Sequence, residues 1–182
     1  MDWDVMLSEL ESSFDAERRA DLVAQSAELA EAEHASIEAV DRLRGSVGRP
    51  VHLRTRGGMP VDGVVTRVES AYVLVDEGEG LQAIVPLAAV AMVMGLAGPA
   101  PRDARRRPAL GALLREIARR GVRVRLVVGT GEVVGRLIRV GADHIDVALD
   151  PEGGVRARRA PGAGGAGVVS VMTAAIEVLR SR

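Results

Sequence analysis

Residues 48–75 read GRPVHLRTRGGMPVDGVVTRVESAYVLV, and residues 121–149 read GVRVRLVVGTGEVVGRLIRVGADHIDVAL. The two stretches place apolar residues and glycines at the same positions once a single residue is deleted from the first turn of the second stretch. The matched pairs are Val51 and Val124, Leu53 and Leu126, Gly63 and Gly135, Val65 and Leu137, Val68 and Val140, Tyr72 and His144, Val73 and Ile145, and Val75 and Val147. The match predicts that one unit occurs twice in the chain.

Each stretch alternates apolar and polar residues, which is typical of half-buried strands. We expect three strands in each, followed by a fourth and a fifth: QAIVP and VAMVMG in the first unit, GVVSVM and IEVLR in the second. Gly63 and Gly135 fall inside the second strand, where glycine marks a bend or bulge that curls a sheet. The pattern predicts a mainly β protein with α-helix, built from two small five-stranded barrels. Since about 50 to 60 residues bury only a marginal core, we expect the barrels to pack together or to pair edge to edge.

Between the two units lies GLAGPAPRDARRRPAL, residues 95–110. Its proline and arginine content predicts a linker over 99–107. The first barrel then covers 46–98 and the second covers 108–182, with a short helix of its own over 108–120.

Residues 1–45 carry 12 Asp and Glu against 4 Arg, while the remainder carries 13 against 20, so an acidic arm with net charge −8 precedes a body with net charge +7. The arm has no proline and is rich in Ala, Glu and Leu, and Gly45 stands where a helix would end. We expect a long amphipathic helix over 1–45 that packs on the body or mediates dimerisation. A monomer or dimer is expected ahead of a ring of three chains.

Composition excludes several function classes. The chain has no cysteine, which rules out disulfides, thiolate metal sites and cysteine nucleophiles, and its three histidines are widely scattered. We find no catalytic constellation and expect no enzymatic activity, no metal site and no cofactor. The N-terminus does not read as a secretory signal, and no apolar run reaches the ~20 residues that span a bilayer. We therefore expect a cytoplasmic protein without a membrane partner.

The strand pattern, the glycine bend in the second strand and the tight turn between the last two strands resemble the Sm-like (LSm/Hfq-type) fold, a small SH3-like barrel. Residues 108–121 are similar to the short helix of that family, and GEVVGRLIRVGADHIDVAL is similar to its first motif. The resemblance covers about 46–98 and 108–182. The tandem arrangement behind an acidic helix also resembles an uncharacterised group of actinobacterial proteins.

The family's RNA-binding motif is not carried over. Sm-like RNA binders typically have Ile-Arg-Gly, two residues and Val at the last turn, where this chain has VPLAAV (85–90) and VMTAAI (171–176). The asparagine of the first motif is also missing, since Asp143 is followed by His144, Ile145 and Asp146. The resemblance therefore implies the fold and does not imply the family's uridine pocket.

Candidate nucleic-acid-binding residues come from three places. Tyr72 and His144 occupy equivalent positions at the start of the third strand, where a ring could stack on a base. Two basic segments could neutralise phosphates: Arg105, Arg106 and Arg107 in the linker, and Arg156, Arg158 and Arg159 in the glycine-rich stretch 151–167. Each of these candidates has a simpler alternative, namely rim packing for the rings and solvated loops for the arginines.

The leading hypothesis is a non-enzymatic nucleic-acid-binding protein that prefers RNA, single-stranded above all, over DNA. We expect low sequence specificity because arginines on loops contact phosphates and not bases. The alternative is a protein–protein adaptor or an oligomerisation scaffold that docks through the helix 1–45.

Overall fold

The computed structural model describes residues 3–100, 108–129, 131–150 and 167–181. Contacts divide the chain into two units, Met1–Glu38 and Ala39–Arg182. From here on, the arm and the body are these two units, so the boundary lies before residue 45. The helices are α1 (Trp3–Ala35), α2 (Ala39–Gly45) and α3 (Leu110–Arg120), with short 3₁₀ turns at Leu87–Ala89 and Thr173–Ala175. No helix in the described part of the chain combines the length and the apolar character that a bilayer crossing requires.

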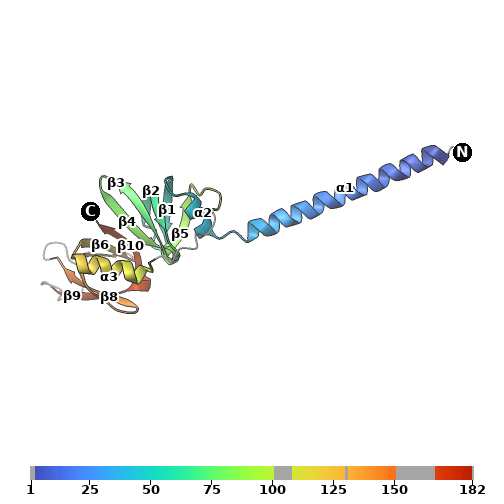
Figure 1. Cartoon of the computed structure of the whole chain (residues 1–182). Coiled ribbons are helices and arrows are strands. Elements are labelled where there is room, and N and C mark those ends of the chain that lie inside the picture. The colour runs from blue at the N-terminus through green and yellow to red at the C-terminus, as the bar shows by residue number, and fades with distance from the viewer. Residues whose placement is uncertain (1–2, 101–107, 130, 151–166, 182) are drawn as a thin grey trace. The chain divides into compact units, whose positions relative to one another are not determined.

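Within the described residues, ten antiparallel strands form one open sheet in the body, in the order β5-β1-β2-β3-β4-β10-β6-β7-β8-β9. Most of these strands are labelled in Figure 1. We call β1–β5 with α2 the N-terminal half, and α3 with β6–β10 the C-terminal half. The strands are β1 (Pro50–Thr55), β2 (Pro60–Val68), β3 (Tyr72–Gly78), β4 (Leu81–Pro86), β5 (Val90–Met94), β6 (Arg123–Val128), β7 (Gly131–Val140), β8 (His144–Leu149), β9 (Val168–Met172) and β10 (Ile176–Ser181). The mainly β class with an N-terminal helix is confirmed.

Two separate barrels, which the sequence pattern predicts, are not confirmed. The two halves share their sheet because β4 pairs with β10, and Leu179 lies opposite Ile84. We call this pairing the β4–β10 joint. The edge-to-edge arrangement that the sequence left open is therefore the observed one. It satisfies backbone groups that would otherwise be exposed along β4 and β10.

The two halves pair their strands in the same register. The corresponding pairs are Val51–Gly63 and Val124–Gly135, Val65–Val75 and Leu137–Val147, Leu53–Val93 and Leu126–Leu179, and Val73–Val85 and Ile145–Val171. The register also shifts at the same place, directly after Val65 in β2 and after Leu137 in β7. A bulge at this position bends each strand and increases its twist.

Gly63 and Gly135 are needed because the neighbouring strand comes very close to them. A Cβ at Gly63 would lie 2.1 Å from the carbonyl oxygen of Asp76, and a Cβ at Gly135 would lie 2.0 Å from that of Ala148. No side chain fits at such distances without moving the backbone. The two glycines therefore lie in the strands that bend, as predicted, and they also leave room for the carbonyl oxygen of the neighbouring strand.

The apolar core has two clusters, and each takes residues from both halves. Val127 and Val178 of the C-terminal half lie in the cluster built mainly from β1–β4. Tyr72 and Ile84 of the N-terminal half lie in the cluster built from β6–β10 and α3. Separating the two halves would therefore expose apolar side chains of both.

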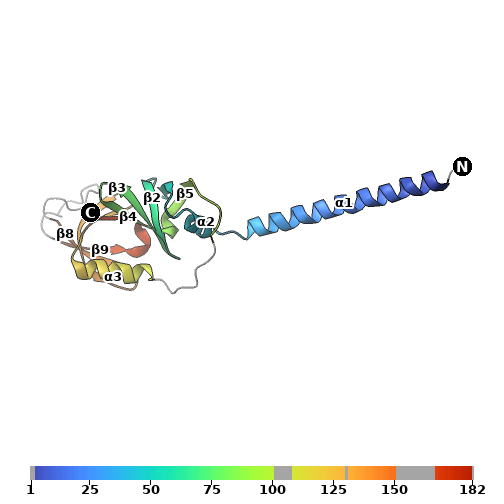
Figure 2. The same ribbon diagram turned by 45° about the horizontal axis from the view of Figure 1, so that its top comes forward.

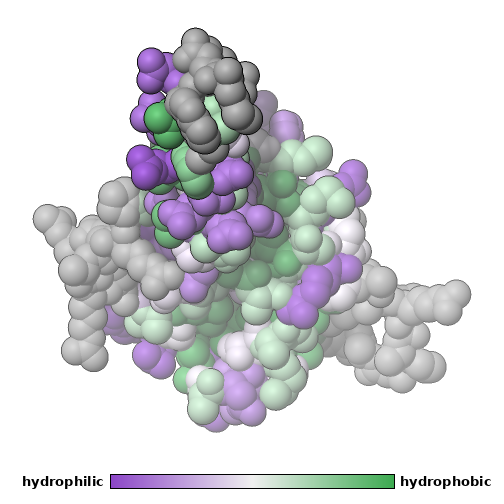
Figure 3. Space-filling model, turned by 90° about the vertical axis from the view of Figure 1, so that its right-hand side faces the viewer, coloured by the Kyte–Doolittle hydropathy of each residue, from purple (hydrophilic) through white to green (hydrophobic). Residues whose placement is uncertain are grey.

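The predicted helix over 1–45 is interrupted at residues 36–38. The Ser36 hydroxyl donates a hydrogen bond to the carbonyl of Glu33 at 2.7 Å, and such bonds compete with helix continuation. The short α2 that follows buries Asp41 and Leu43 on the body and ends at Gly45, the predicted stop. In α1, every side chain that the structure describes is exposed. Figure 3 shows hydrophilic residues interspersed with hydrophobic ones on the face that it presents.

Candidate nucleic-acid interface

Tyr72 begins β3 and His144 begins β8, so the structure places the two predicted ring positions equivalently. Tyr72, however, is only 2% exposed and packs with the cluster of the C-terminal half. Burial raises the pKa of its phenol, the Glu69 carboxylate raises it further, and Arg67 opposes the shift. Because neither face of the ring is open to a base, the prediction that Tyr72 stacks on a ligand is wrong in this structure. The ring instead belongs to the apolar cluster that also contains Ile84 and Leu179 of the β4–β10 joint.

His144 remains accessible at the end of β8. Its side chain is 39% exposed, and its Nδ1 lies 2.8 Å from Oδ1 of Asp143. The hydrogen bond from His144 lowers the pKa of the Asp143 carboxyl. An ionised aspartate beside the ring repels phosphates, so His144 alone is a poor contact for a nucleic-acid backbone.

The two predicted arginine segments lie outside the described residues. Arg105, Arg106 and Arg107 fall within 101–107, and Arg156, Arg158 and Arg159 fall within 151–166. Their role as phosphate contacts stays a prediction.

The structure brings together a different set of arginines, along α3. This helix buries Leu114 and packs against β7. Figure 2 shows α3 beside the strands of the body. It ends at Gly121, which has φ +61° and donates its backbone N–H to the carbonyl of Ala118 at 3.1 Å. A glycine in the left-handed region is a common helix end. The apolar side of α3 thus faces the sheet, and Arg115 and Arg119 stay exposed one turn apart.

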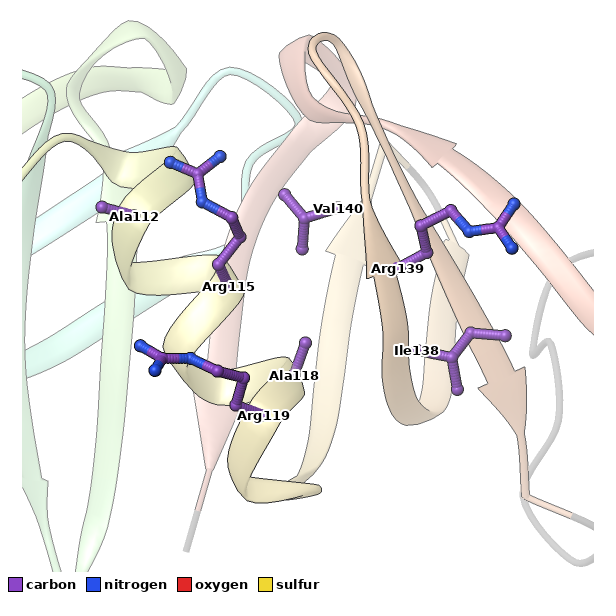
Figure 4. A pocket seen from close by; sticks show the side chains of 7 residues that line it. All are labelled: Ala112, Arg115, Ala118, Arg119, Ile138, Arg139 and Val140. Carbon is purple, nitrogen blue, oxygen red and sulfur yellow. The ribbon is translucent and has the colours of Figure 1, made fainter.

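A groove of about 440 Å³ runs between α3 and β7. We call it the α3–β7 groove. Figure 4 shows Ala118 and Val140 between its two sides, with Arg115 and Arg119 on the helix and Arg139 on the strand. The three guanidinium groups point outward from the groove rather than toward one another. Ala112 and Ile138 complete the lining.

Few acidic groups neutralise these arginines. Arg119 is paired with Glu116, which also accepts a hydrogen bond from Arg120 at 2.7 Å. The bond from Arg120, with the field of Arg119, lowers the pKa of Glu116. Arg139 is 4.0 Å from Asp146, at the limit of an ion pair. Within the described ranges Arg115 has no ion pair, so the groove has an excess of positive charge.

No known protein-family model matches this chain. No curated protein matches its sequence either. The description of the site therefore depends on its own geometry. Among the residues that the structure describes, no three His, Asp or Glu side chains gather in a way that could hold a metal ion.

The sequence contained a signal for the groove that our prediction did not use. Residues 114–120 read LREIARR, and the spacing of Arg115 and Arg119 puts both on one face of a helix. The contribution of Arg139 could not be read in this way, because it depends on where β7 lies beside α3.

Proposed function

We propose that each half of the body is one copy of a five-stranded Sm-like module. The shared registers support this, as do the shared bulge position and the two glycines that face a carbonyl oxygen. The strand order β5-β1-β2-β3-β4 in the N-terminal half has its counterpart, β10-β6-β7-β8-β9, in the C-terminal half. The function follows from the site and not from the fold, since one fold can host many functions.

We propose that the protein binds nucleic acid, single-stranded RNA above all, without catalysing a reaction on it. The observation that carries this proposal is the α3–β7 groove, where Arg115, Arg119 and Arg139 flank an apolar floor. Arginine forms paired hydrogen bonds with phosphate oxygens. The segments with Arg105–Arg107 and Arg156–Arg159 would add phosphate contacts. Such contacts hold a backbone without reading its bases, so low sequence specificity follows.

The groove lacks the features of a base-reading site. No aromatic ring lines it, and the last-turn sequences VPLAAV and VMTAAI have neither the Arg nor the Gly of the family's RNA-binding motif. We therefore place the proposed contact on α3 and β7 and not at the last turn of either half.

A titration of fluorescent single-stranded RNA, followed by anisotropy at two salt concentrations, tests the proposal. The groove variant R115Q/R139Q should bind several-fold more weakly than the wild type. The control R49Q/R54Q removes the same charge from two exposed arginines of the N-terminal half, and it should bind nearly as well as the wild type. Equal losses in both variants, or no binding at low salt, would contradict the proposal. Parallel titrations with single-stranded and duplex DNA test the preference for RNA.

A second function, that of an oligomerisation scaffold, is favoured by the two outer edges of the sheet. The edge strands β5 and β9 read VAMVM and VVSVM, and neither contains a charge or a proline. Met94 is 53% exposed and Val168 is 61% exposed. Natural sheets protect long edges with charges, prolines or bulges, because an open edge pairs with another chain. We propose that β9 of one copy pairs with β5 of the next.

We call the proposed contact between β9 of one copy and β5 of the next the open joint. The β4–β10 joint, which is closed within one chain, gives the register expected for it. By the matched positions of the two halves, β9 corresponds to β4 and β5 corresponds to β10. The pairs Leu179–Ile84 and Arg180–Ala83 then predict Val93 opposite Ser170 and Met94 opposite Val169. Such a contact is head to tail, so it closes into a ring or continues as a filament. This proposal replaces the monomer or dimer expected from the sequence.

The open joint would be apolar where the closed one is ionic. At the closed joint, Arg180 is hydrogen-bonded to Glu77 at 2.6 and 2.8 Å. The corresponding positions at the open joint are Met94 and Leu149. Its strength should therefore depend little on salt, unlike the binding of nucleic acid.

Cysteine cross-linking tests the proposed register, since the chain has no cysteine of its own. Chains with M94C and chains with V169C are mixed and oxidised, and a disulfide-linked dimer is expected. The control mixture of M94C and I138C replaces V169C by an exposed residue away from the edge, and it should give little product. A monomer mass at every concentration, or equal cross-linking in both mixtures, would contradict the scaffold.

A further inference from the structure

The arm presents a long helix, α1, with apolar side chains on its surface. All its described side chains are exposed, and they include Phe14, Leu22, Val23 and Leu29. Leu29 is 71% exposed. Most of the stability of a helix in a protein comes from packing an apolar face, so we expect these apolar residues of α1 to pack on a partner surface.

Charge decides what kind of partner fits. Between residues 3 and 35 the helix carries nine Asp and Glu and two Arg. Two copies of α1 placed side by side would bring like charges together, and this disfavours a simple helix pair. A positively charged surface with an apolar strip is the complementary partner.

The α3–β7 groove has both properties. Its floor includes Ala118 and Val140, and exposed Ile138 continues it. Its rims carry Arg115, Arg119 and Arg139. Since α3 has 11 residues, it is roughly 16 Å long, enough to lie along three turns of a second helix.

The sequence of α1 supplies matching groups at the right spacing. Leu22 and Leu29 are seven residues apart, so they lie on one face about two turns apart. Asp21 and Glu28 each precede one of these leucines and flank the same face. Such a helix can place its leucines over the groove floor and its carboxylates beside the arginines on the rim.

We infer that the α3–β7 groove is a docking surface for an acidic helix, and that α1 of a second copy of this chain occupies it. In this contact, the acidic helix of one molecule binds the basic groove of another. It does not depend on the proposed binding of nucleic acid or on the pairing of sheet edges. An acidic helix in this groove would compete with any phosphate backbone for the same arginines.

A charge-reversal experiment on the full-length protein tests the contact. Analytical ultracentrifugation at low salt should show association of the wild type. Two double charge reversals, D21R/E28R in the helix and R115E/R139E in the groove, should each weaken it about tenfold or more. An equimolar mixture of the two variants should recover association, because the positive helix of one meets the negative groove of the other. Lack of recovery in the mixture would overturn the inference.

Cross-linking separates this contact from pairing at the sheet edges. A mixture of L22C chains and I138C chains should form a disulfide-linked dimer on oxidation, whereas L22C mixed with V64C should not. Val64 is a fair control because, like Ile138, it is an exposed β-branched residue on a strand, and it lies outside the groove. Adding M92K and V168K to both partners blocks the edges and should leave the L22C–I138C product unchanged. Its loss, or equal product with V64C, would refute docking of α1 in the groove.

Discussion

Leu179 of β10 lies opposite Ile84 of β4, and through this pair the two halves of the body become one sheet. Both side chains are buried, and Ile84 belongs to the cluster of the opposite half. The joint is also braced by polar contacts, since Arg180 bonds to Glu77 and the Thr55 hydroxyl donates to the Glu177 carboxylate at 2.6 Å. The two halves are therefore expected to unfold together.

Removing Glu77 should destabilise the whole body. Arg180 and Glu77 are 17% and 14% exposed, so E77A leaves a mostly buried guanidinium without its carboxylate. We expect a loss of about 1–3 kcal/mol in the free energy of unfolding, measured by urea denaturation. D62N, which removes a carboxylate from an exposed pair with His52, is the control and should change little. We expect one unfolding transition, which E77A shifts as a whole to lower urea concentration. Two separated transitions would show that the halves fold independently.

The two bend glycines should respond alike to substitution. G63A and G135A each push a methyl group into a backbone carbonyl, and overpacking of this kind costs about 1–3 kcal/mol or more. Thermal unfolding should show similar losses for both. G98A is the control, because no atom lies within 4 Å of its added Cβ. A large loss in only one of the two would argue against equivalent halves.

The ionisation of Tyr72 reports on the packing of the cluster that also contains Ile84 and Leu179 of the joint. It can be followed by itself because Tyr72 is the single tyrosine of the chain. Burial raises the pKa of its phenol in the folded state above the value of about 10 expected for an unfolded chain. The folded state thus favours the neutral phenol. The stability linked to it is complete below pH 10 and is lost as the pH rises through the folded-state pKa.

Ultraviolet titration of the phenolate checks this prediction. Native protein should ionise at a higher pH than protein in concentrated urea, and Y72F should remove the alkaline loss of stability that Tyr72 causes. Equal titration curves in the two states would mean that the ring is solvated and that the joint is open.

The sequence allowed the strands to be predicted because each half alternates apolar and polar residues around a glycine that tolerates no Cβ. The sequence allowed the two units either to pack together or to pair edge to edge, and the structure has the edge pairing. It did not predict the break after Ala35, where the Ser36 hydroxyl competes for a helix carbonyl.

The candidate site was harder to predict. The matched positions correctly placed Tyr72 and His144 at the same point in the two halves. Nevertheless, only tertiary packing determines that Tyr72 is buried while His144 stays accessible. The groove joins Arg115 of α3 to Arg139 of β7, and that proximity is a property of tertiary packing.

The salt dependence of RNA binding tests the central claim, that the α3–β7 groove holds a phosphate backbone. For single strands, the slope of log K against log salt is about −0.7 for each phosphate that is neutralised. The variant R115Q/R139Q should therefore have a slope shallower by about 1.4 than the wild type, while R49Q/R54Q should keep the wild-type slope. A groove variant with an unchanged slope would contradict the account.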